Sequence, residues 1–223
     1  MPEELKMITP DMLAGDPFNP PVIDFEKGLS AAPVFALVLI AVNIAAFGWE
    51  LGVGALKSRE AVIAAGAIYG PKVFGGESWR LATGMFLHAG FGHLIGNCLA
   101  IYVLGMTSEQ AWGRLRSLGI YFVSGLAASF ASAFLEPRPS VGASGAIFGL
   151  MGAAVVFFRR HGGSFYPRNR RIGNALLGWG LLQLVLGSLS PIVDNWAHFG
   201  GLAAGAVFGF TMESRLFQKR PSV

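Results

Sequence analysis

Two residue types that together could hydrolyse a peptide bond lie in separate apolar segments, each near the start of its segment. Ser144, inside the tetrad GASG (142–145), begins a hydrophobic stretch that runs to Phe158, and His198 lies near the start of a later one. A histidine can take the proton of a serine hydroxyl, so such a pair can act as nucleophile and general base. The tetrad is not the nucleophile elbow of soluble hydrolases, because Ala146 stands where that motif needs glycine.

Ser144 also has a simpler interpretation, since serine is a common N-cap of helices. Its neighbours Gly142 and Gly145 carry no side chains and leave the hydroxyl and the nearby N–H groups open to a substrate carbonyl. The first N–H groups of a helix lack intrahelical partners, and the helix dipole favours negative charge there. Taken alone, the residues leave both the N-cap and the nucleophile open.

A second polar group falls in an earlier apolar segment. His93 and Asn97 are four positions apart and therefore point the same way on a helix, and His88 precedes them. Polar groups inside a membrane are costly and suggest function. They can equally act as hydrogen-bonding contacts between helices, worth about 0.6 kcal/mol each on average. A metal site is disfavoured, because no carboxylate or cysteine accompanies the histidines at ligand spacing.

The elements that must position these residues are membrane helices. The chain of 223 residues is 53% hydrophobic and only 13% charged, whereas soluble domains carry about 25% charged residues. No segment has a charged residue in its middle, which argues against a soluble helical core and against an ion transporter. We therefore predict an all-α integral membrane protein with six transmembrane helices. The apolar segments are 33–51, 88–107, 117–135, 144–158, 173–190 and 195–212.

The distribution of basic residues predicts the orientation. With the N-terminus inside, twelve of the 17 Lys and Arg residues fall on the inner side, so both termini are expected in the cytoplasm. The basic pI follows from this topology and does not indicate nucleic-acid binding. We expect a weakly structured cytoplasmic extension over 1–30, a helical domain over 31–214 and a basic tail over 215–223. The long outside loop, about 52–87, is apolar enough to lie on the membrane or fold back into it.

Glycines indicate how the two reactive segments could meet. Gly145 and Gly149 follow Ser144 at helical spacing, and Gly201 and Gly205 follow His198 on one face. Small residues let helix backbones approach closely in a membrane. Contact between these two faces would bring the serine and the histidine to about 3 Å, the separation that a nucleophile and its base need.

Three motifs in order resemble the rhomboid intramembrane serine proteases of the bacterial six-helix type. They are HAGFGHLIGN (88–97), GASGAIFG (142–149) and AHFGGLAAGA (197–206), with Trp79 and Arg80 in the first outside loop. The resemblance covers roughly residues 33–212. It implies a six-helix bundle in the cell (inner) membrane, with a membrane-associated first loop and a substrate gate over about 173–195.

The resemblance also assigns roles to residues. It makes Ser144 the nucleophile and His198 the general base, with His93 and Asn97 as oxyanion donors beside the backbone N–H of Ser144. Phe148 matches an aromatic ring that packs on the catalytic histidine. The family uses a dyad, so Asp194 is not expected to complete a triad.

The implied activity is peptide-bond hydrolysis in or near transmembrane segments of other membrane proteins. The expected partners are those substrates and the lipid bilayer, with no nucleic acid and no cofactor or metal. The oligomeric state and the physiological substrate are open. A catalytically dead relative that binds membrane clients and a transporter are the competing interpretations, but Ser144 and His198 are both present and intramembrane charge is lacking.

Overall fold

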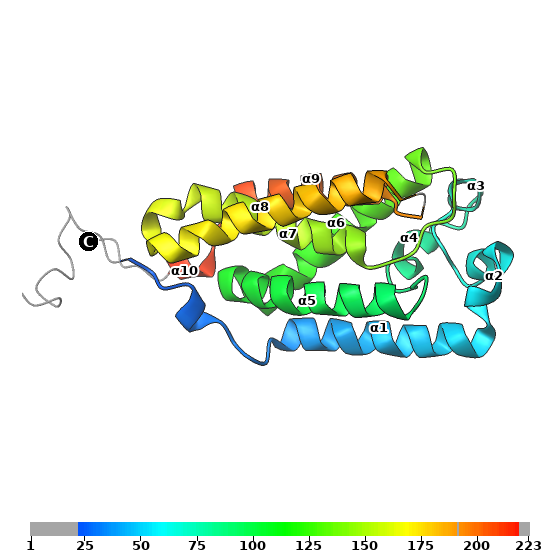
Figure 1. The fold of residues 1–223 in the computed structure, drawn as a ribbon, viewed down its shortest axis with the longest axis horizontal. Coiled ribbons are helices and arrows are strands. Elements are labelled where there is room, and N and C mark those ends of the chain that lie inside the picture. Colours follow the sequence, from blue (N-terminus) through cyan, green and yellow to red (C-terminus); the bar gives the residue numbers. More distant parts are fainter. Residues whose placement is uncertain (1–21, 191, 219–223) are drawn as a thin grey trace, which may run out of the picture.

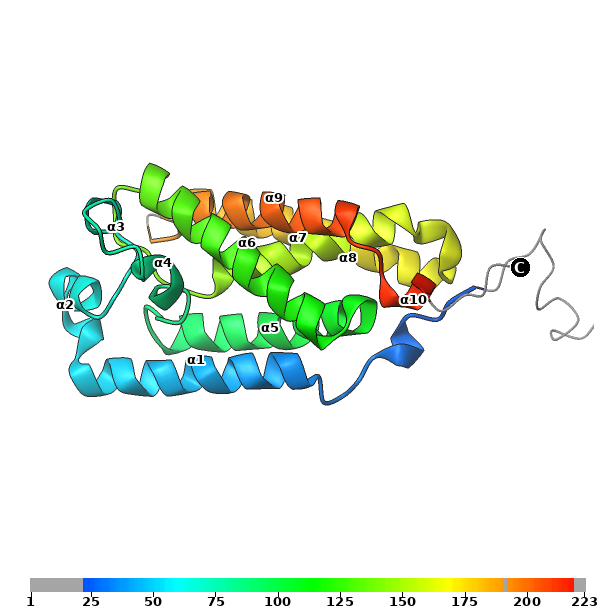
Figure 2. The same cartoon turned by 180° about the vertical axis from the view of Figure 1, so that it is seen from behind.

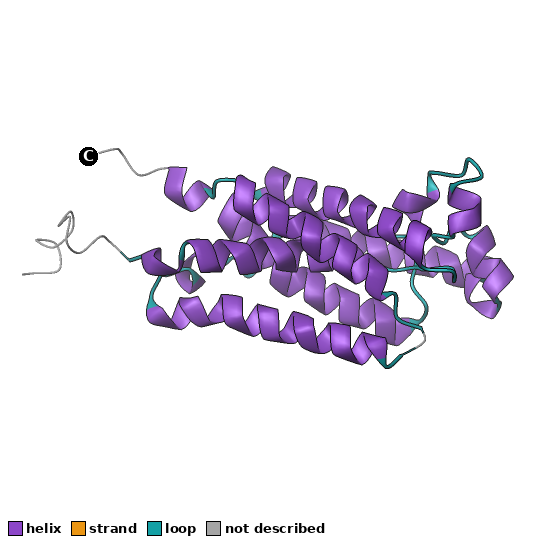
Figure 3. Ribbon diagram, turned by 90° about the horizontal axis from the view of Figure 1, so that it is seen from above, coloured by secondary structure: helices purple, strands orange, loops and turns teal. Residues whose placement is uncertain are grey.

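The structure, a computed structural model, describes residues 22–190 and 192–218. Within these ranges the regular structure is helical, apart from two isolated β-bridges (Figure 3). Six of the described helices have 17 or more residues: α1 (Val34–Val53), α5 (Phe91–Trp112), α6 (Arg114–Leu135), α7 (Ser144–Arg160), α8 (Pro167–Ser188) and α9 (Asn195–Thr211). The short helices are η1 (Glu26–Gly28), η2 (Ala55–Lys57), α2 (Arg59–Ala64), α3 (Gly70–Val73), α4 (Arg80–Thr83), η3 (Gly162–Ser164) and α10 (Arg215–Gln218).

Three of the long helices are long and apolar enough to cross a membrane, namely α1, α5 and α6. The other three depart from that pattern for different reasons. The helices α7 and α9 have only 17 residues each, and α8 begins with a polar turn that contains Arg168, Arg170 and Arg171. All six coincide with the apolar segments of the sequence, so the predicted all-helical architecture is confirmed among the described residues.

The long helices lie side by side, with α7 surrounded by its neighbours (Figures 1 and 2). Thirteen of its 17 residues are buried, which makes it the centre of the bundle. The helices α5, α7 and α9 all begin at the end of the bundle where α1 finishes and where α2, α3 and α4 lie. We call this the site end, and the opposite end the far end. Three helix N-termini therefore point their unpaired N–H groups toward the site end.

The segment between α1 and α5 forms backbone hydrogen bonds with residues 140–142, which precede α7. Ile68 and Ser140 exchange two backbone hydrogen bonds of 2.9 and 2.8 Å, and the N–H of Gly142 donates to the carbonyl of Gly84 at 2.9 Å. Arg80, 4% exposed, anchors the segment internally because its Nε donates to Glu77 at 2.8 Å. This long connection thus holds in place the residues that lead into Ser144.

The far end is closed by the beginning and the end of the described chain. Phe25 is 1% exposed and packs against Phe157, Phe158 and Phe165, while its N–H donates to Asn169 at 3.0 Å. The extension expected to be weakly structured lies mostly outside the described residues. In its described part, from residue 22, Phe25 fills an aromatic pocket, while Val22 and residues 26–28 are exposed.

Candidate active site

Ser144 and His198 meet at the site end of the bundle. Nε2 of His198 lies 3.0 Å from Oγ of Ser144, within hydrogen-bond distance. Ser144 is the first residue of α7, and His198 lies in the first turn of α9. The imidazole is only 8% exposed. A serine hydroxyl and a histidine nitrogen in this geometry can transfer a proton when the hydroxyl attacks a carbonyl.

Backbone contact between α7 and α9 produces this short distance. A Cβ atom added to Gly201 would lie 1.9 Å from the carbonyl oxygen of Gly145, and one added to Gly205 would lie 1.8 Å from that of Gly149. Neither position has room for any side chain. The predicted approach of the two glycine faces is therefore confirmed, and it is close enough that one backbone rests on the other.

Two further residues hold the histidine. The ring of Phe148 stacks on that of His198 with 4.2 Å between centroids and 9° between planes, as the family resemblance predicted. Oδ1 of Asp194 accepts a hydrogen bond from the N–H of Ala197 at 3.0 Å and so caps α9. Nδ1 of His198 is buried and has no hydrogen-bond partner among the described residues. Asp194 thus acts as an N-cap of α9, and its described side-chain hydrogen bond goes to Ala197 and not to His198.

His93 and Asn97 lie beside Gly142, two residues before Ser144. A Cβ atom on Gly142 would come within 2.6 Å of Cε1 and 2.9 Å of Nε2 of His93, and within 3.5 Å of Nδ2 of Asn97. Gly142 has φ +131°, a conformation that favours glycine. Nδ2 of Asn97 is buried and donates to no acceptor among the described residues. Two side-chain nitrogens therefore flank the backbone just before Ser144.

The structure also brings in a residue that sequence reasoning missed. Glu50 lies in the last turn of α1 with 0% of its surface exposed, and its carboxylate accepts hydrogen bonds from the N–H of His88. Glu50 is not in the middle of its apolar segment, where a charge is most costly. A carboxylate in the last turn of an apolar segment was the signal that could have indicated this residue, because Glu is mostly exposed and its burial costs free energy.

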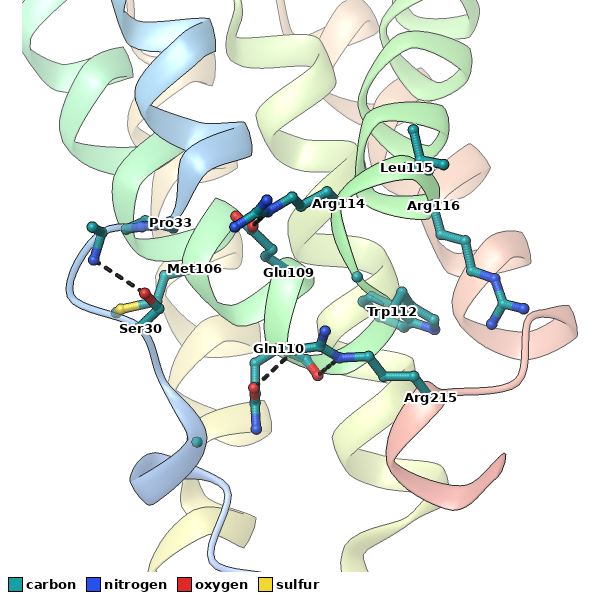
Figure 4. Close-up of a pocket in the computed structure, with 13 residues that line it drawn as sticks. Ser30, Pro33, Met106, Glu109, Gln110, Trp112, Arg114, Leu115, Arg116 and Arg215 are labelled. Carbon is teal, nitrogen blue, oxygen red and sulfur yellow. Dashed lines mark hydrogen bonds and ion pairs between the residues drawn. The ribbon is translucent and has the colours of Figure 1, made fainter. Parts of the chain in front are cut away.

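A hollow lies at the far end, and none of these residues lines it. It has a volume of about 510 Å³ and is lined by the junction of α5 and α6 together with Arg215 of α10. Figure 4 shows the polar side chains that surround it. Arg114 donates to Glu109 at 2.8 Å, and Arg215 donates to the carbonyl oxygen of Gln110 at 3.0 Å. These bonds tie α10 and the start of α6 to α5. We therefore interpret the hollow as part of the packing between helices at the far end.

Comparison with known proteins gives a consistent family. The family model for the rhomboid domain matches residues 75–215. The chain is 36% identical over 181 residues to the rhomboid protease GluP of Bacillus subtilis (strain 168), covering 81% of this chain and 34% of GluP. It is 40% identical over 140 residues to RHOMBOID-like protein 5 of Arabidopsis thaliana, covering 61% of this chain and 45% of that protein.

A third relative is matched over most of its length. The chain is 31% identical over 204 residues to the rhomboid protease AarA of Providencia stuartii, covering 79% of this chain and 71% of AarA. By contrast, the chain spans only about a third of GluP and less than half of RHOMBOID-like protein 5. The matched domain includes Ser144, His198, His93 and Asn97, and this chain belongs to the rhomboid family.

Proposed function

We propose that this protein is an intramembrane serine endopeptidase that hydrolyses peptide bonds in or near the transmembrane segments of other membrane proteins. The observation that carries the proposal is the 3.0 Å contact between Oγ of Ser144 and Nε2 of His198. It occurs at the start of two helices that are joined by glycine contacts in an otherwise apolar bundle. Two relatives, GluP and AarA, are named rhomboid proteases.

In the proposed reaction Oγ of Ser144 attacks the substrate carbonyl carbon while Nε2 of His198 takes the hydroxyl proton. The resulting tetrahedral oxyanion collapses to an acyl-enzyme, and His198 passes its proton to the leaving amine. A water molecule then attacks the ester, gives a proton to His198, and Ser144 recovers its hydrogen as the acid leaves. The stack of Phe148 on the imidazole, with 9° between planes, supports a fixed ring orientation through both steps.

The negative charge on the tetrahedral intermediate requires donors. We assign this role to His93 and Asn97, which flank Gly142, and to the N–H of Ser144 at the start of α7. In soluble serine proteases one such donor is worth about 3–4 kcal/mol. The unpartnered Nδ2 of Asn97 supports this assignment, since a donor held ready costs no reorganisation during the reaction.

The placement in the membrane belongs to the same proposal. We propose that all six long helices form the membrane domain over 31–214, with the extension 1–30 and the tail 215–223 on the cytoplasmic side of the cell (inner) membrane. With 17 residues each, α7 and α9 are shorter than the roughly 20 residues that span a bilayer. They then need a locally thin bilayer, or neighbouring helices that shield their ends from lipid. The segment 52–87 lies at the outer surface and partly in it, which its exposed Phe74 and Trp79 support.

Cleavage of a co-expressed single-span membrane protein tests the proposal. Ser144→Ala and His198→Ala should each abolish cleavage, and a fluorophosphonate probe should label the wild type at Ser144 only. Undiminished cleavage by purified Ser144→Ala protein would refute the assignment, as would labelling at full rate after His198→Ala.

The oxyanion donors are tested separately. His93→Ala and Asn97→Ala should each lower kcat by about 10²–10³ while the melting temperature stays close to that of the wild type. If either variant instead unfolds with no specific loss of kcat, the residue is a packing contact between helices.

A further inference from the structure

A buried carboxylate connects the first helix to the candidate oxyanion site. Glu50 is completely enclosed, and its Oε1 and Oε2 accept from the single N–H of His88 at 3.1 and 2.9 Å. The partner that the structure gives to this carboxylate is a backbone amide rather than a Lys or Arg. Burial of a carboxylate is expensive, so its position between α1 and this particular turn calls for an explanation.

The turn that Glu50 holds leads directly into His93. The N–H of Ala89 donates to Nδ1 of His93 at 3.4 Å, and the rings of His88 and His93 lie 5.2 Å apart, edge to face. The imidazole of His88 is itself completely buried, with Nδ1 3.1 Å from the carbonyl oxygen of Phe86. A shift of the amide at His88 would therefore move the Ala89 N–H and the His88 ring, two of the groups beside the His93 imidazole.

Few other contacts define where α5 begins. Its N-cap is Gly90, with φ +152°, so no side chain caps the helix. Phe47, one turn before Glu50, packs edge to face against Phe91 with 4.9 Å between centroids. The last two turns of α1 thus supply a polar contact through Glu50 and an apolar contact through Phe47 to the start of α5.

The location of His93 makes small displacements important. Its imidazole lies against Gly142, where even a methyl group would come within 2.6 Å of Cε1. Donors that stabilise an oxyanion must be held within about 0.5 Å of the productive position. A residue that fixes the approach of His93 to this backbone would influence the rate without touching substrate.

We propose that Glu50 is a positioning residue: by holding the amide of His88 it sets the turn 86–90, and through that turn it fixes the His93 imidazole against Gly142. The inference rests on the proposed function, since it assigns Glu50 to the oxyanion site of that reaction. It places a determinant of catalysis on α1, a helix that carries none of the four candidate catalytic residues.

The test compares Glu50→Ala, Glu50→Gln and Asn43→Ala in the full-length protein. Asn43 is the matched control, because it is also fully buried in α1 but donates within its own helix, to the carbonyl oxygen of Leu39 at 2.7 Å. Glu50→Ala should lower kcat about tenfold or more with KM little changed. Glu50→Gln keeps an acceptor oxygen and should stay within about threefold of the wild type, and Asn43→Ala within about twofold.

A double-mutant cycle with His93→Ala separates positioning from general stability. If Glu50 acts through His93, Glu50→Ala should cost less than about twofold in kcat once His93 is already alanine. An equal loss in both backgrounds, or a fall in melting temperature with kcat unchanged, would overturn the proposal.

Amide exchange supplies a readout that does not depend on cleavage. Deuterium uptake by peptides covering 86–93 should rise in Glu50→Ala and stay unchanged in Asn43→Ala. Unchanged uptake in Glu50→Ala would refute the contact as a determinant of the turn. If the wild type itself cleaves no membrane substrate, the proposed function fails, while the exchange result still decides whether Glu50 orders this segment.

Discussion

Two of the helices that contact α7, namely α9 and α8, pack against it in different ways. Gly201 and Gly205 of α9 rest directly on carbonyl oxygens of α7, where an added Cβ would lie less than 2 Å away. Against α8, the close contacts are with side chains: a Cβ added to Gly180 would lie 2.7 Å from Cε of Met151, and one added to Gly173 would lie 2.7 Å from Cβ of Phe158. Only five of the 22 residues of α8 are buried, against thirteen of 17 in α7.

For the proposed protease, this difference would serve two requirements: a fixed geometry of Ser144 and His198, and a helix that can move to admit substrate. Where one backbone rests directly on another, no side chain can change its rotamer to relieve a shift. The helices that carry Ser144 and His198 therefore stay in one register.

The contact of Gly180 with the flexible end of Met151 can yield when α8 moves, whereas the contact of Gly173 with Cβ of Phe158 lies next to the backbone and yields less. For the proposed protease, we therefore expect a substrate segment to enter on the side of α7 that α8 covers. The family resemblance implies a substrate gate over about 173–195, and that gate stays a prediction.

Breaking the α7–α9 contact should have the largest effect. Gly205→Ala places a methyl group 1.8 Å from the carbonyl oxygen of Gly149, so the helices must separate. We expect destabilisation of about 3 kcal/mol and loss of cleavage, because the Ser144–His198 distance lengthens. Thermal unfolding in detergent and a cleavage assay measure both. Gly178→Ala is the matched control, since nothing lies within 4 Å of that position; wild-type behaviour of Gly205→Ala would contradict the backbone contact.

Loosening the site end of α8 should have an intermediate effect of the opposite sign. Nδ2 of Asn195 donates to the carbonyl oxygen of Leu184 at 3.0 Å and to Oγ of Ser188 at 2.9 Å, which ties the end of α8 to the start of α9. Asn195→Ala should raise the cleavage rate of a membrane substrate about two- to fivefold if opening limits the rate.

A small probe distinguishes access from chemistry in that variant. Fluorophosphonate labelling of Ser144 should change less than about twofold in Asn195→Ala, because the probe needs no wide opening. Ser188→Ala removes only one of the two hydrogen bonds of Asn195, so it should raise the cleavage rate less than Asn195→Ala does. Slower cleavage together with slower labelling would show that Asn195 supports the dyad instead of restraining α8.

Adding a methyl group between α7 and α8 should have a small effect on stability. A methyl group at Gly180 meets the terminal carbon of Met151 at 2.7 Å, and that side chain can turn away. Gly180→Ala should therefore change stability by less than about 1 kcal/mol, as measured by thermal unfolding beside Gly205→Ala. Destabilisation equal to that of Gly205→Ala would show that the two faces of α7 pack alike.

The smallest effect is expected at the far end of α8, where Arg168 pairs with Asp24. Burial of the Asp24 carboxyl opposes its ionisation, but the hydrogen bond and charge of Arg168 outweigh it and lower the pKa below the usual 3.8. The pair therefore stabilises the fold above the unfolded pKa, and this contribution is lost as pH falls through the folded one. Asp24→Asn should lower the melting temperature slightly at pH 6, and the difference from wild type should shrink as the pH falls below about 3.8 and vanish once the pH is below the folded pKa. A constant difference across that range would exclude the ion pair as its source.

Much of this arrangement could be predicted from the sequence because it depends on local patterns. Each of the six long helices coincides with an apolar segment, and the glycine spacing after Ser144 and His198 indicated the face on which they meet. The start of α7 at Ser144 also followed from the sequence, since the apolar run begins there and Gly142 precedes it.

The remainder could not be predicted because it depends on contacts between distant parts of the chain. Nothing local to Glu50 indicates that its partner is the amide of His88, 38 positions away. The same holds for the pairing of Ile68 with Ser140 and for the burial of Phe25 in an aromatic pocket at the far end. Such contacts follow from how the bundle closes, and hydropathy carries no information about them.

The backbone contact between α7 and α9 also separates the chemistry from the surrounding lipid. In the proposed placement, lipid tails would touch exposed apolar side chains on α8, such as Val185, and on α9, such as Val207, whereas the face of α9 at Gly205 rests on the backbone of α7. A bilayer of different thickness should then alter how readily α8 yields and leave the Ser144–His198 distance unchanged. In kinetic terms, lipid composition should change substrate entry while the rate of acylation, once a peptide bond is in place, stays constant.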